Sequence, residues 1–413
     1  MATISAKPVR GTRDILPDEM AVRERLERTI SDIYAAHGFT RVETPALENI
    51  DLLLGSEGGE NLKMLFTVLK RGSKFKPTAE SGVTDLCDIG LRYDLTLPLS
   101  RFYAGHAETL DMPFKALQIG NVFRAERPQK GRFRSFKQCD IDIIGEPSVS
   151  AEIELIHTTA AALLAIGFHD FTVHINDRRL LSDFILSHGF SAEDIGAVCI
   201  ALDKADKIGA DGVKAELTDR GYDEDKVTAL VDGVGAVTVD TLESVSHSDA
   251  AADLINVINT SKTLAKGRYA VEFDFHLIRG MGYYTGQVFE ITLDGVGYSV
   301  AGGGRYDNMI GKYAKKSVPA VGFSIGFERI VGLIMDGFIP SDETTRRKVA
   351  LFYESDADMA EVIAASEKLI ADGYHVSLVK AKKKLGKQIG QYENAGYAGM
   401  MVFGRDEQVK LFD

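Results

Sequence analysis

The chain has 413 residues, of which 45% are hydrophobic and 26% are charged, and its formal net charge is −12. This length and composition are typical of a globular protein with two or three domains, because a single hydrophobic core rarely grows to this size. The longest apolar runs, such as Ala160–Ile166, fall far short of the roughly 20 residues that a membrane span needs, so we expect no association with a membrane.

The N-terminus and the cysteines favour a cytoplasmic location. Residues 1–13 contain no apolar run of the kind that a secretory signal needs. Cys87, Cys139 and Cys199 lie far apart and form no CxxC pair, which argues against a disulfide framework and against structural zinc. The histidines also lack metal-ligand spacing, so we expect no metal held by a cluster of protein side chains.

Charge is distributed unevenly along the chain. The overall acidity argues against RNA as a partner, because RNA phosphates attract Lys and Arg. The stretch Asp177–Lys262 holds 17 acidic and 8 basic residues, whereas Arg124–Lys137 holds six basic residues and one acid. The net charge therefore says little about any one binding face.

The first half of the chain predicts a mixture of helices and strands. Residues 18–37 carry apolar side chains every three to four positions between Pro17 and Gly38, which predicts an amphipathic helix. The elements predicted after it are strands at 40–43, 91–97, 114–123 and 136–144, a helix at 150–166 and a strand at 171–175.

The composition changes at residue 177. Residues 177–266 are short, acidic, helix-like pieces broken by glycines, which predict an inserted helical subdomain. Strand-like sequence resumes at 270–275, 283–291 and 298–301, followed by Gly302–Gly304 and an apolar helix at 326–335.

A polar linker at 340–348 precedes a region in which strands and helices alternate. The predicted elements are strands at 349–353, 375–379 and 399–403 and helices at 359–371 and 385–395. This order predicts a small three-layer α/β domain with a parallel core. We therefore expect a main domain of residues 1–176 and 267–339, a helical insertion at 177–266 and a C-terminal domain at 340–413.

The basic loop between the strands 114–123 and 136–144 is the most informative segment. Its arginines can grip phosphates through two parallel hydrogen bonds, and Phe136 can stack on a base. A solvated surface hairpin is the alternative interpretation.

Polar side chains recur on the strands that flank this loop. Asp94 and Thr96 are two residues apart, and Gln138, Asp140 and Asp142 share one face of another predicted strand. Carboxylates on a buried sheet face are unfavourable unless they meet a cation or a ligand rich in donors. A ligand with an amino group and an imidazole would satisfy them; an internal salt-bridge network with Arg92 or Arg124 is the alternative.

Three further segments are weaker signals by themselves. Arg279–Gly286 combines glycines with Tyr283 and Tyr284, which permits close approach of the backbone to a ligand. Gly302–Tyr306 is rich in glycine but lacks the ending of a phosphate-binding P-loop. Glu328 and Arg329 can place an arginine beside a nucleotide, although such a pair is usually a surface feature. His276 lies near Asp274 without a nucleophile, so a hydrolytic triad is not expected.

In this order the segments resemble the class II aminoacyl-tRNA synthetases, and specifically the histidyl-tRNA synthetase family. The resemblance covers nearly the whole chain. Residues 39–48 resemble the first class II motif, Phe123–Phe136 the second and Gly322–Arg329 the third, while Arg279–Gly286 and Gly303–Tyr306 resemble two motifs of the histidine enzymes. It implies an α+β fold: an antiparallel catalytic sheet flanked by helices, a helical insertion and a C-terminal three-layer α/β anticodon-binding domain.

The resemblance also implies a role for each site residue. Those that would hold L-histidine are Asp94, Leu95, Thr96, Gln138, Asp142, Tyr283, Tyr284 and Tyr306. Those that would hold ATP are Arg124, Glu126, Arg132, Phe136 and Arg329, with Glu126 reading the adenine amino group and Phe136 stacking on the ring. Arg124 and Arg279 would act in catalysis from opposite sides of the α-phosphate. Those that would contact tRNA are Arg127, Gln129, Lys382, Lys383 and Lys384, although a solvated basic helix end explains the lysines equally well.

The implied reaction is ligation of histidine to tRNA(His) at the expense of ATP and with Mg²⁺, by a homodimer. Two departures from the family stand out: Gly282 occupies a position where an Asp is common, and Asp413 follows soon after the third C-terminal strand, which predicts a short C-terminal domain. The regulatory subunit of ATP phosphoribosyltransferase shares the catalytic fold but generally loses the ATP-binding residues, which this chain retains. A general RNA-binding module does not explain the polar pocket of Asp94, Gln138 and Asp142.

Overall fold

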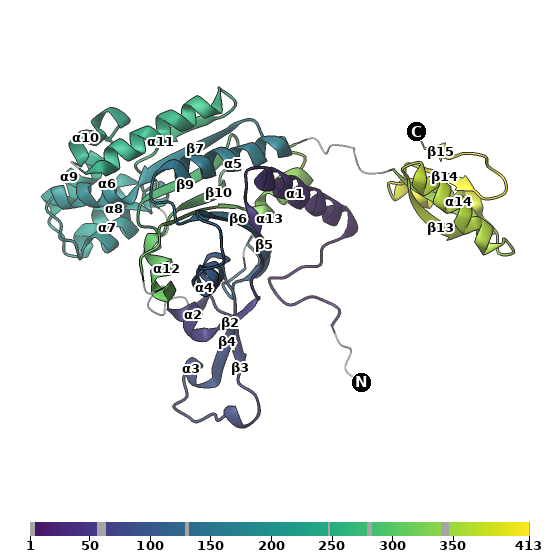
Figure 1. Ribbon diagram of the computed structural model, residues 1–413, viewed down its shortest axis with the longest axis horizontal. Coiled ribbons are helices and arrows are strands. Elements are labelled where there is room, and N and C mark those ends of the chain that lie inside the picture. Colours follow the sequence, from purple (N-terminus) through teal and green to yellow (C-terminus); the bar gives the residue numbers. More distant parts are fainter. Residues whose placement is uncertain are drawn as a thin grey trace. The chain divides into compact units, whose positions relative to one another are not determined.

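The computed structural model describes residues 5–412 except 56–62, 129–131, 247, 279–282, 315 and 340–346. It divides into two compact units, Met1–Ile339 and Pro340–Asp413 (Figure 1). Each unit has apolar clusters of its own, as expected for domains that could fold separately.

A large sheet organises the first unit. Among the described residues it has eight strands in the order β1-β5-β6-β11-β10-β9-β7-β8. Their bounds in that order are Thr40–Arg41, Phe114–Phe123, Ser135–Ile144, Ala320–Ile325, Ser299–Arg305, Gln287–Leu293, Phe171–Asp177 and Ala270–Phe273. The inner strands pair antiparallel, and only the edge pairs β1–β5 and β7–β8 are parallel. The predicted α+β class is confirmed.

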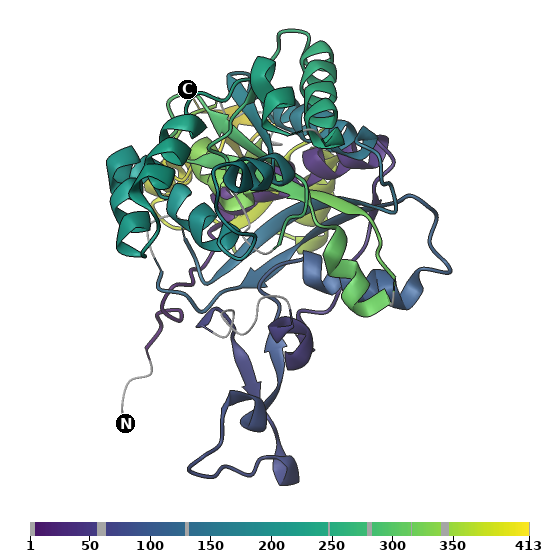
Figure 2. The same ribbon diagram turned by 90° about the vertical axis from the view of Figure 1, so that its left-hand side faces the viewer.

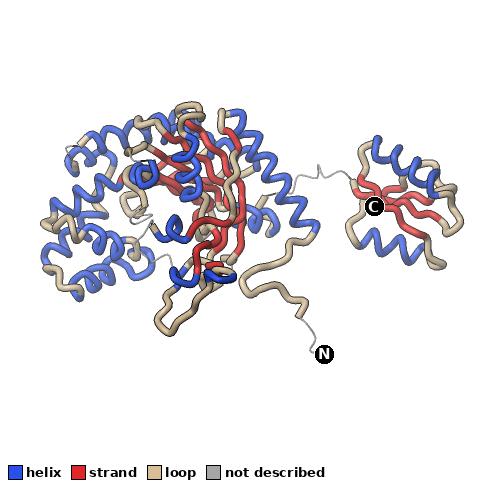
Figure 3. Tube along the Cα trace, turned by 60° about the horizontal axis from the view of Figure 1, so that its bottom comes forward, coloured by secondary structure: helices blue, strands red, loops and turns tan. Residues whose placement is uncertain are grey.

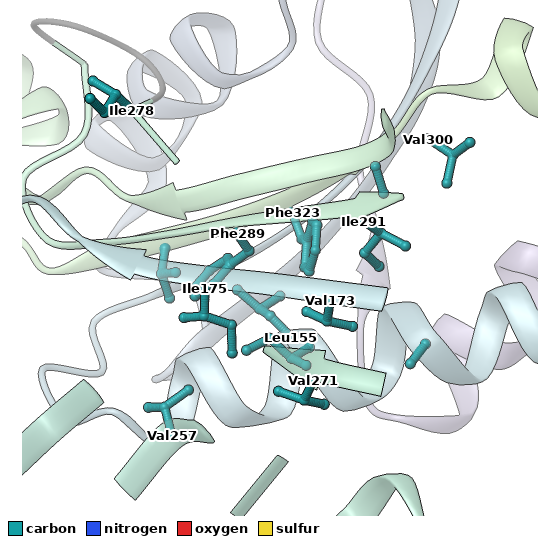
Figure 4. Packing of buried hydrophobic residues seen from close by; sticks show 14 of the residues in the cluster. Leu155, Val173, Ile175, Val257, Val271, Ile278, Phe289, Ile291, Val300 and Phe323 are labelled. Carbon is teal, nitrogen blue, oxygen red and sulfur yellow. The ribbon is translucent and has the colours of Figure 1, made fainter. Parts of the chain in front are cut away.

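Helices cover both faces of this sheet (Figure 1). On one face lie α1 (Pro17–Ala36), α5 (Ser150–Ile166), α11 (Asp249–Ala265) and α13 (Phe327–Met335), which share an apolar cluster with the strands. Figure 4 shows Val173, Ile175 and Phe289 of this cluster meeting Leu155 of α5. On the other face lie α2 (Ile50–Leu54), α4 (Thr96–His106) and α12 (Asp307–Ala314).

The insertion connects β7 to β8. It consists of α6 (Arg178–Ser187), α7 (Ile195–Leu202), α8 (Ala205–Asp219), α9 (Glu224–Val234), the 3₁₀ turn η3 (Val239–Thr241), α10 (Leu242–Val245) and α11. Its apolar residues, among them Val213, Leu230 and Leu254, belong to the same cluster as the main sheet. The insertion is therefore helical and shares the core of the main sheet.

A small antiparallel sheet projects from the first unit (Figures 1 and 2). It contains β2 (Leu47–Asn49), β4 (Cys87–Leu91) and β3 (Thr67–Leu69), with η2 (Gly72–Lys74) and α3 (Val83–Leu86) between the last two in the chain. Sequence periodicity did not predict this sheet, because strands of three to five residues give too little alternation.

The second unit has the predicted three layers (Figure 3). Its sheet has the order β13-β12-β14-β15, with bounds His375–Lys380, Lys348–Tyr353, Gly399–Val402 and Lys410–Leu411. Helices α14 (Met359–Ala371) and α15 (Leu385–Asn394) pack on opposite faces through two separate apolar clusters. The three parallel strands are confirmed, whereas the short antiparallel β15 was not predicted.

Candidate active site

A cavity of about 590 Å³ opens on the face of the main sheet formed by β6, β10 and β11. The loop between β5 and β6, the start of α4 and the start of α13 complete its walls. Predicted site residues that line it are Asp94, Thr96, Arg124, Glu126, Arg127, Arg132, Phe136, Gln138, Asp142, Tyr283, Tyr284, Tyr306 and Arg329. Segments more than 200 residues apart in the chain therefore meet at one site, as the sequence motifs predicted.

The remaining predicted residues are not among the described residues that line the cavity. Leu95 does not line the cavity: its side chain is buried, and its carbonyl accepts a hydrogen bond from Gln118 Nε2 at 3.0 Å. Arg279 and Gln129 fall outside the described residues. Lys382, Lys383 and Lys384 belong to the second unit, between β13 and α15.

One wall of the cavity carries two buried carboxyl groups on β6. Tyr306 donates a hydrogen bond to Asp142 Oδ1 at 2.6 Å, and Ser324 Oγ donates to Asp140 Oδ1 at 2.5 Å. Burial raises the pKa of Asp142 to about 7, and burial together with the charge of Asp142 raises the pKa of Asp140 to about 8. Asp142 Oδ2 and Gln138 Oε1 have no hydrogen-bond partner among the described residues, which leaves two buried acceptors for a ligand with donors.

The predicted strand at 91–97 is wrong. Strand β4 ends at Leu91 and helix α4 begins at Thr96, so Asp94 lies in the turn between them. Its Oδ1 accepts a hydrogen bond from the backbone N–H of Leu97 at 3.2 Å, within the first turn of the helix. Such a local side-chain bond favours a turn over continued strand, and both Asp94 and Thr96 still face the cavity.

Three tyrosines stand beside the carboxyl groups. The ring centroids of Tyr283 and Tyr284 are 4.9 Å apart, and those of Tyr283 and Tyr306 are 5.8 Å apart. Burial raises the pKa of Tyr283 and Tyr306 well above the usual range, so both hydroxyls keep their protons and remain donors.

Glycines form the floor of the cavity. The sequence placed Gly302–Gly304 after a strand, but these residues lie within β10. A Cβ atom on Gly303 would overlap the carbonyl oxygen of Gly322, and one on Gly322 would overlap Asp142 Oδ1. Glycine is therefore required here because the backbones of β10 and β11 and the carboxylate of β6 approach so closely.

Arginines and an aromatic ring also line the cavity. Arg124 Nε donates to the Tyr93 carbonyl at 3.1 Å, and its guanidinium lies 5.1 Å from the centroid of the Phe136 ring. This cation–π contact fixes both groups at the mouth of the β5–β6 loop. Arg92, the alternative partner of the carboxylates, instead donates to the carbonyls of Thr44 and Asn121.

Glu328 and Arg329 do not form a surface pair. Glu328 accepts hydrogen bonds from both terminal nitrogens of Arg23, at 2.7 and 2.6 Å, and from the backbone N–H of Lys137 at 3.0 Å. Arg329 bonds to the carbonyl of Ser299 and lies 5.2 Å over the ring of Tyr298.

Ser299, Tyr298 and Ser324 were missed because their partners lie far away in the chain. Asp140 was noticed on the polar face but received no role. Its alternation with Gln138 and Asp142 was the available signal.

Two further findings concern metal ions and membranes. No group of three or more His, Cys, Asp or Glu side chains in the described part of the chain is placed to hold a metal ion. None of the described helices is both long and apolar enough to cross a membrane.

Comparisons with known proteins agree with the geometry. The family model described as "Histidyl-tRNA synthetase" matches residues 11–330. A histidine–tRNA ligase of Leifsonia xyli subsp. xyli is 42% identical over 98% of this chain and 97% of its own, and one of Bacteroides fragilis is 34% identical over 98% and 93%.

Solved structures show the same fold. The crystal structure of histidyl-tRNA synthetase from Nostoc sp. PCC 7120 has a TM-score of 0.79 at 28% identity, and the match covers 96% of this chain and 91% of that one. A structure from Bacillus halodurans, described as an ATP phosphoribosyltransferase regulatory subunit/histidyl-tRNA synthetase, also has a TM-score of 0.79. At 20% identity over 97% of this chain and 98% of that one, it shows the fold alone.

Proposed function

The chain belongs to the histidyl-tRNA synthetase family and is a histidine–tRNA ligase, and we propose that its cavity is divided into a histidine end and an ATP end. The enzyme activates L-histidine with ATP to histidyl-adenylate and pyrophosphate, and then transfers histidine to the 3′ end of tRNA(His). The observation that carries the division is that the cavity lining holds both the carboxyl groups of β6 and the guanidinium groups of Arg124, Arg132 and Arg329.

At the histidine end, Asp94 and Asp142 receive the ammonium group of the substrate. Gln138, Thr96 and the three tyrosines meet the imidazole and the rest of the amino acid. The free acceptors Asp142 Oδ2 and Gln138 Oε1 support this assignment, because buried acceptors are stable only when a donor reaches them. Leu95 supports the turn through its carbonyl and is not proposed as a contact.

At the ATP end, Phe136 stacks on adenine and Glu126 reads its amino group. Arg132 and Arg329 grip the phosphate tail, while Arg124 binds both the α-phosphate and the histidine carboxylate. Arg124 is suited to the double role because it contacts the ring of Phe136 and lines the same cavity as the carboxyl groups. Arg279 completes the arrangement from the other side of the α-phosphate, a role that rests on its sequence motif.

Activation is an in-line displacement. A histidine carboxylate oxygen attacks the α-phosphorus, the bond to the bridging oxygen breaks, and pyrophosphate leaves. Negative charge grows on nonbridging oxygens, so fixed guanidinium groups stabilise the transition state without a proton transfer. Mg²⁺ enters with ATP as part of the substrate, bound by phosphate oxygens and water as this hard ion prefers.

Transfer requires the tRNA to reach the same cavity. The terminal ribose hydroxyl of tRNA attacks the carbonyl carbon of the adenylate, and AMP leaves. Arg127 lines the cavity mouth and is exposed, which suits contact with the acceptor end, and Gln129 follows it in the chain. In the second unit, Lys382, Lys383 and Lys384 provide cations for tRNA phosphates, and the unit as a whole is assigned to anticodon binding.

The active species is a cytoplasmic homodimer. Residues 39–48, which resemble the first class II motif, would form part of the interface. Leu47 on β2 is 51% exposed and Leu69 on β3 of the same small sheet is 55% exposed, so apolar surface remains for a second copy.

Histidine-dependent exchange between ATP and pyrophosphate tests the division of the cavity. The wild type should catalyse exchange, and Arg124→Ala should lower its rate by about 10³-fold, since it removes preorganised charge at the α-phosphate. Arg405→Ala, an exposed arginine of the second unit, is the matched control and should exchange normally. Absence of exchange by the wild type with saturating histidine and MgATP would contradict the function; binding of histidine alone would then favour a regulatory role.

A further inference from the structure

A cluster of charges surrounds Glu328 at the start of α13, beside the proposed ATP ligands. Glu328, whose side chain is 10% exposed, is held by Arg23, which is 7% exposed. Burial alone would raise the pKa of Glu328, but the hydrogen bonds from Arg23 and Lys137 and the charges of Arg23 and Arg13 together lower it, so the carboxylate stays charged. Glu328 precedes Arg329, and its acceptor contact to the N–H of Lys137 lies next to Phe136. One carboxylate therefore ties together the backbones that carry two proposed ATP ligands.

The N-terminal segment adds a second attachment to this cluster. Arg13 Nη2 lies 2.6 Å from Glu19 Oε1 and 3.4 Å from Glu328 Oε2. The same guanidinium lies 4.7 Å from the centroid of the Phe133 ring, which belongs to the β5–β6 loop and lines the cavity. Arg13 itself does not line the cavity. Instead it contacts two residues that do, Phe133 and Glu328.

Backbone contacts hold the same segment against the loop. Arg134 N donates to the Gly11 carbonyl at 2.7 Å, and within the loop the side chain of Arg134 donates through Nε to the Glu126 carbonyl at 3.0 Å. Gly11 has φ = +86°, and a Cβ atom there would lie 2.8 Å from the Arg134 side chain. The register between residues 9–14 and the loop is therefore fixed, which keeps the guanidinium of Arg13 over Phe133.

We propose that Arg13 is a positioning residue for ATP, which holds Phe133 and Glu328 so that the β5–β6 loop and Arg329 face the nucleotide. The proposal rests on the ATP end assigned above. The contacts of Arg13 are with the β5–β6 loop and with the start of α13. The histidine ligands Asp94 and Asp142 come from the β4–α4 turn and the middle of β6. Loss of Arg13 thus weakens ATP binding selectively.

The first test is the steady-state kinetics of exchange for Arg13→Ala and Arg13→Lys. Arg13→Ala should raise the KM for ATP about tenfold, since an ion pair and a cation–π contact to the loop are lost together. The KM for histidine should stay within about twofold, because no histidine ligand moves. Arg13→Lys, which keeps the charge over Phe133, should recover most of the ATP KM.

Arg10→Ala is the matched control. Arg10 is exposed, three residues away, and contributes its carbonyl to Arg134, which alanine preserves. It should leave both KM values unchanged. Equal increases in both KM values for Arg13→Ala, or no recovery with lysine, would overturn the proposal in favour of a general structural role.

A double-mutant cycle with Phe133→Leu tests the path of the effect. If Arg13 acts through the ring, Arg13→Ala should raise the ATP KM by a clearly smaller factor in the Phe133→Leu protein than in the wild type. If the two substitutions instead raise the ATP KM by fully multiplicative factors, Phe133 does not transmit the effect of Arg13, and the proposal is overturned. The outcome is separable from the proposed function, because an active wild type and an inactive Arg124→Ala protein would stand whatever Arg13 does.

Discussion

Strand β6 has two buried faces that meet very different surroundings. On one face Cys139, Ile141 and Ile143 are at most 1% exposed and belong to the apolar cluster shared with α1 and α5. On the other face Asp140 and Asp142 are 4% and 2% exposed and line the cavity. Burial lowers the free energy of the apolar face and raises that of the carboxylates, which lose water. Substrate binding is thus assigned to the face where burial without ligand is unfavourable.

Among the substitutions that test this contrast between the two faces of β6, Asp142→Asn is expected to have the largest effect. It should lower kcat/KM for histidine about 10³-fold, or about 4 kcal/mol, because a buried charge that meets the substrate ammonium is removed. The thermal midpoint of the free protein should hold or rise, since a strained buried carboxyl is also removed. Exchange kinetics and thermal unfolding check both. A midpoint several degrees lower would show that Asp142 stabilises the fold.

The apolar face should respond in the opposite way. Ile141→Ala should lower the free energy of unfolding by about 3 kcal/mol, because it leaves a cavity in a core with no room to collapse. Urea unfolding of the variant measures the loss. Its KM for histidine should remain within about twofold of the wild type. A large KM increase would mean that the two faces are mechanically coupled and would break the comparison.

The dependence of stability on pH distinguishes the polar face of β6 from its apolar face without truncating a side chain of the apolar core. The pKa values of Asp140 and Asp142 are about 8 and about 7 when folded, above the ordinary 3.8. Between pH 4 and 8 the folded protein therefore binds more protons than the unfolded chain, so their contribution to stability falls as the pH rises.

Thermal midpoints of the histidine-free protein across this range check the sign. The fall should be smaller in the Asp140→Asn, Asp142→Asn double variant. As the pH rises toward 7, the affinity for histidine should increase, because the ammonium prefers the charged carboxylates. The increase should be up to about tenfold per pH unit for each proton that histidine binding releases. Identical pH profiles for the two proteins would contradict the raised pKa values.

The smallest effect is expected for Ser324→Ala. The hydroxyl donates to Asp140 Oδ1, so its loss should raise the pKa of Asp140 further and weaken histidine binding by about fivefold at pH 7. Titration calorimetry of histidine binding measures this change. Ser100→Ala, whose hydroxyl bonds to the Thr96 carbonyl within α4, is the control. Equal effects of both substitutions would point to a general change in packing.

The contrast within β6 could be predicted from the sequence, because alternation places residues 138, 140 and 142 on one face whatever surrounds them. The same rule failed at Asp94 and Thr96, where a side-chain bond to the backbone of Leu97 replaces the strand by a turn. The pairing of Asp140 with Ser324 and the attachment of Glu328 to Arg23 were beyond sequence reasoning. Each joins positions more than 180 residues apart that only the assembled sheet and helices bring together.

We propose that the glycine floor limits which amino acids the cavity accepts. The cavity ends on the backbones of β10 and β11, and their hydrogen-bonded register places Gly322 beside Asp142. Side chains can change rotamer to admit a larger ligand, whereas backbone atoms joined by a ladder of hydrogen bonds move only if the whole sheet moves. The glycine floor therefore has a fixed shape and does not adapt to a larger ligand. Attempts to change the amino acid that is accepted should therefore alter the tyrosine side of the cavity and leave its depth as it is.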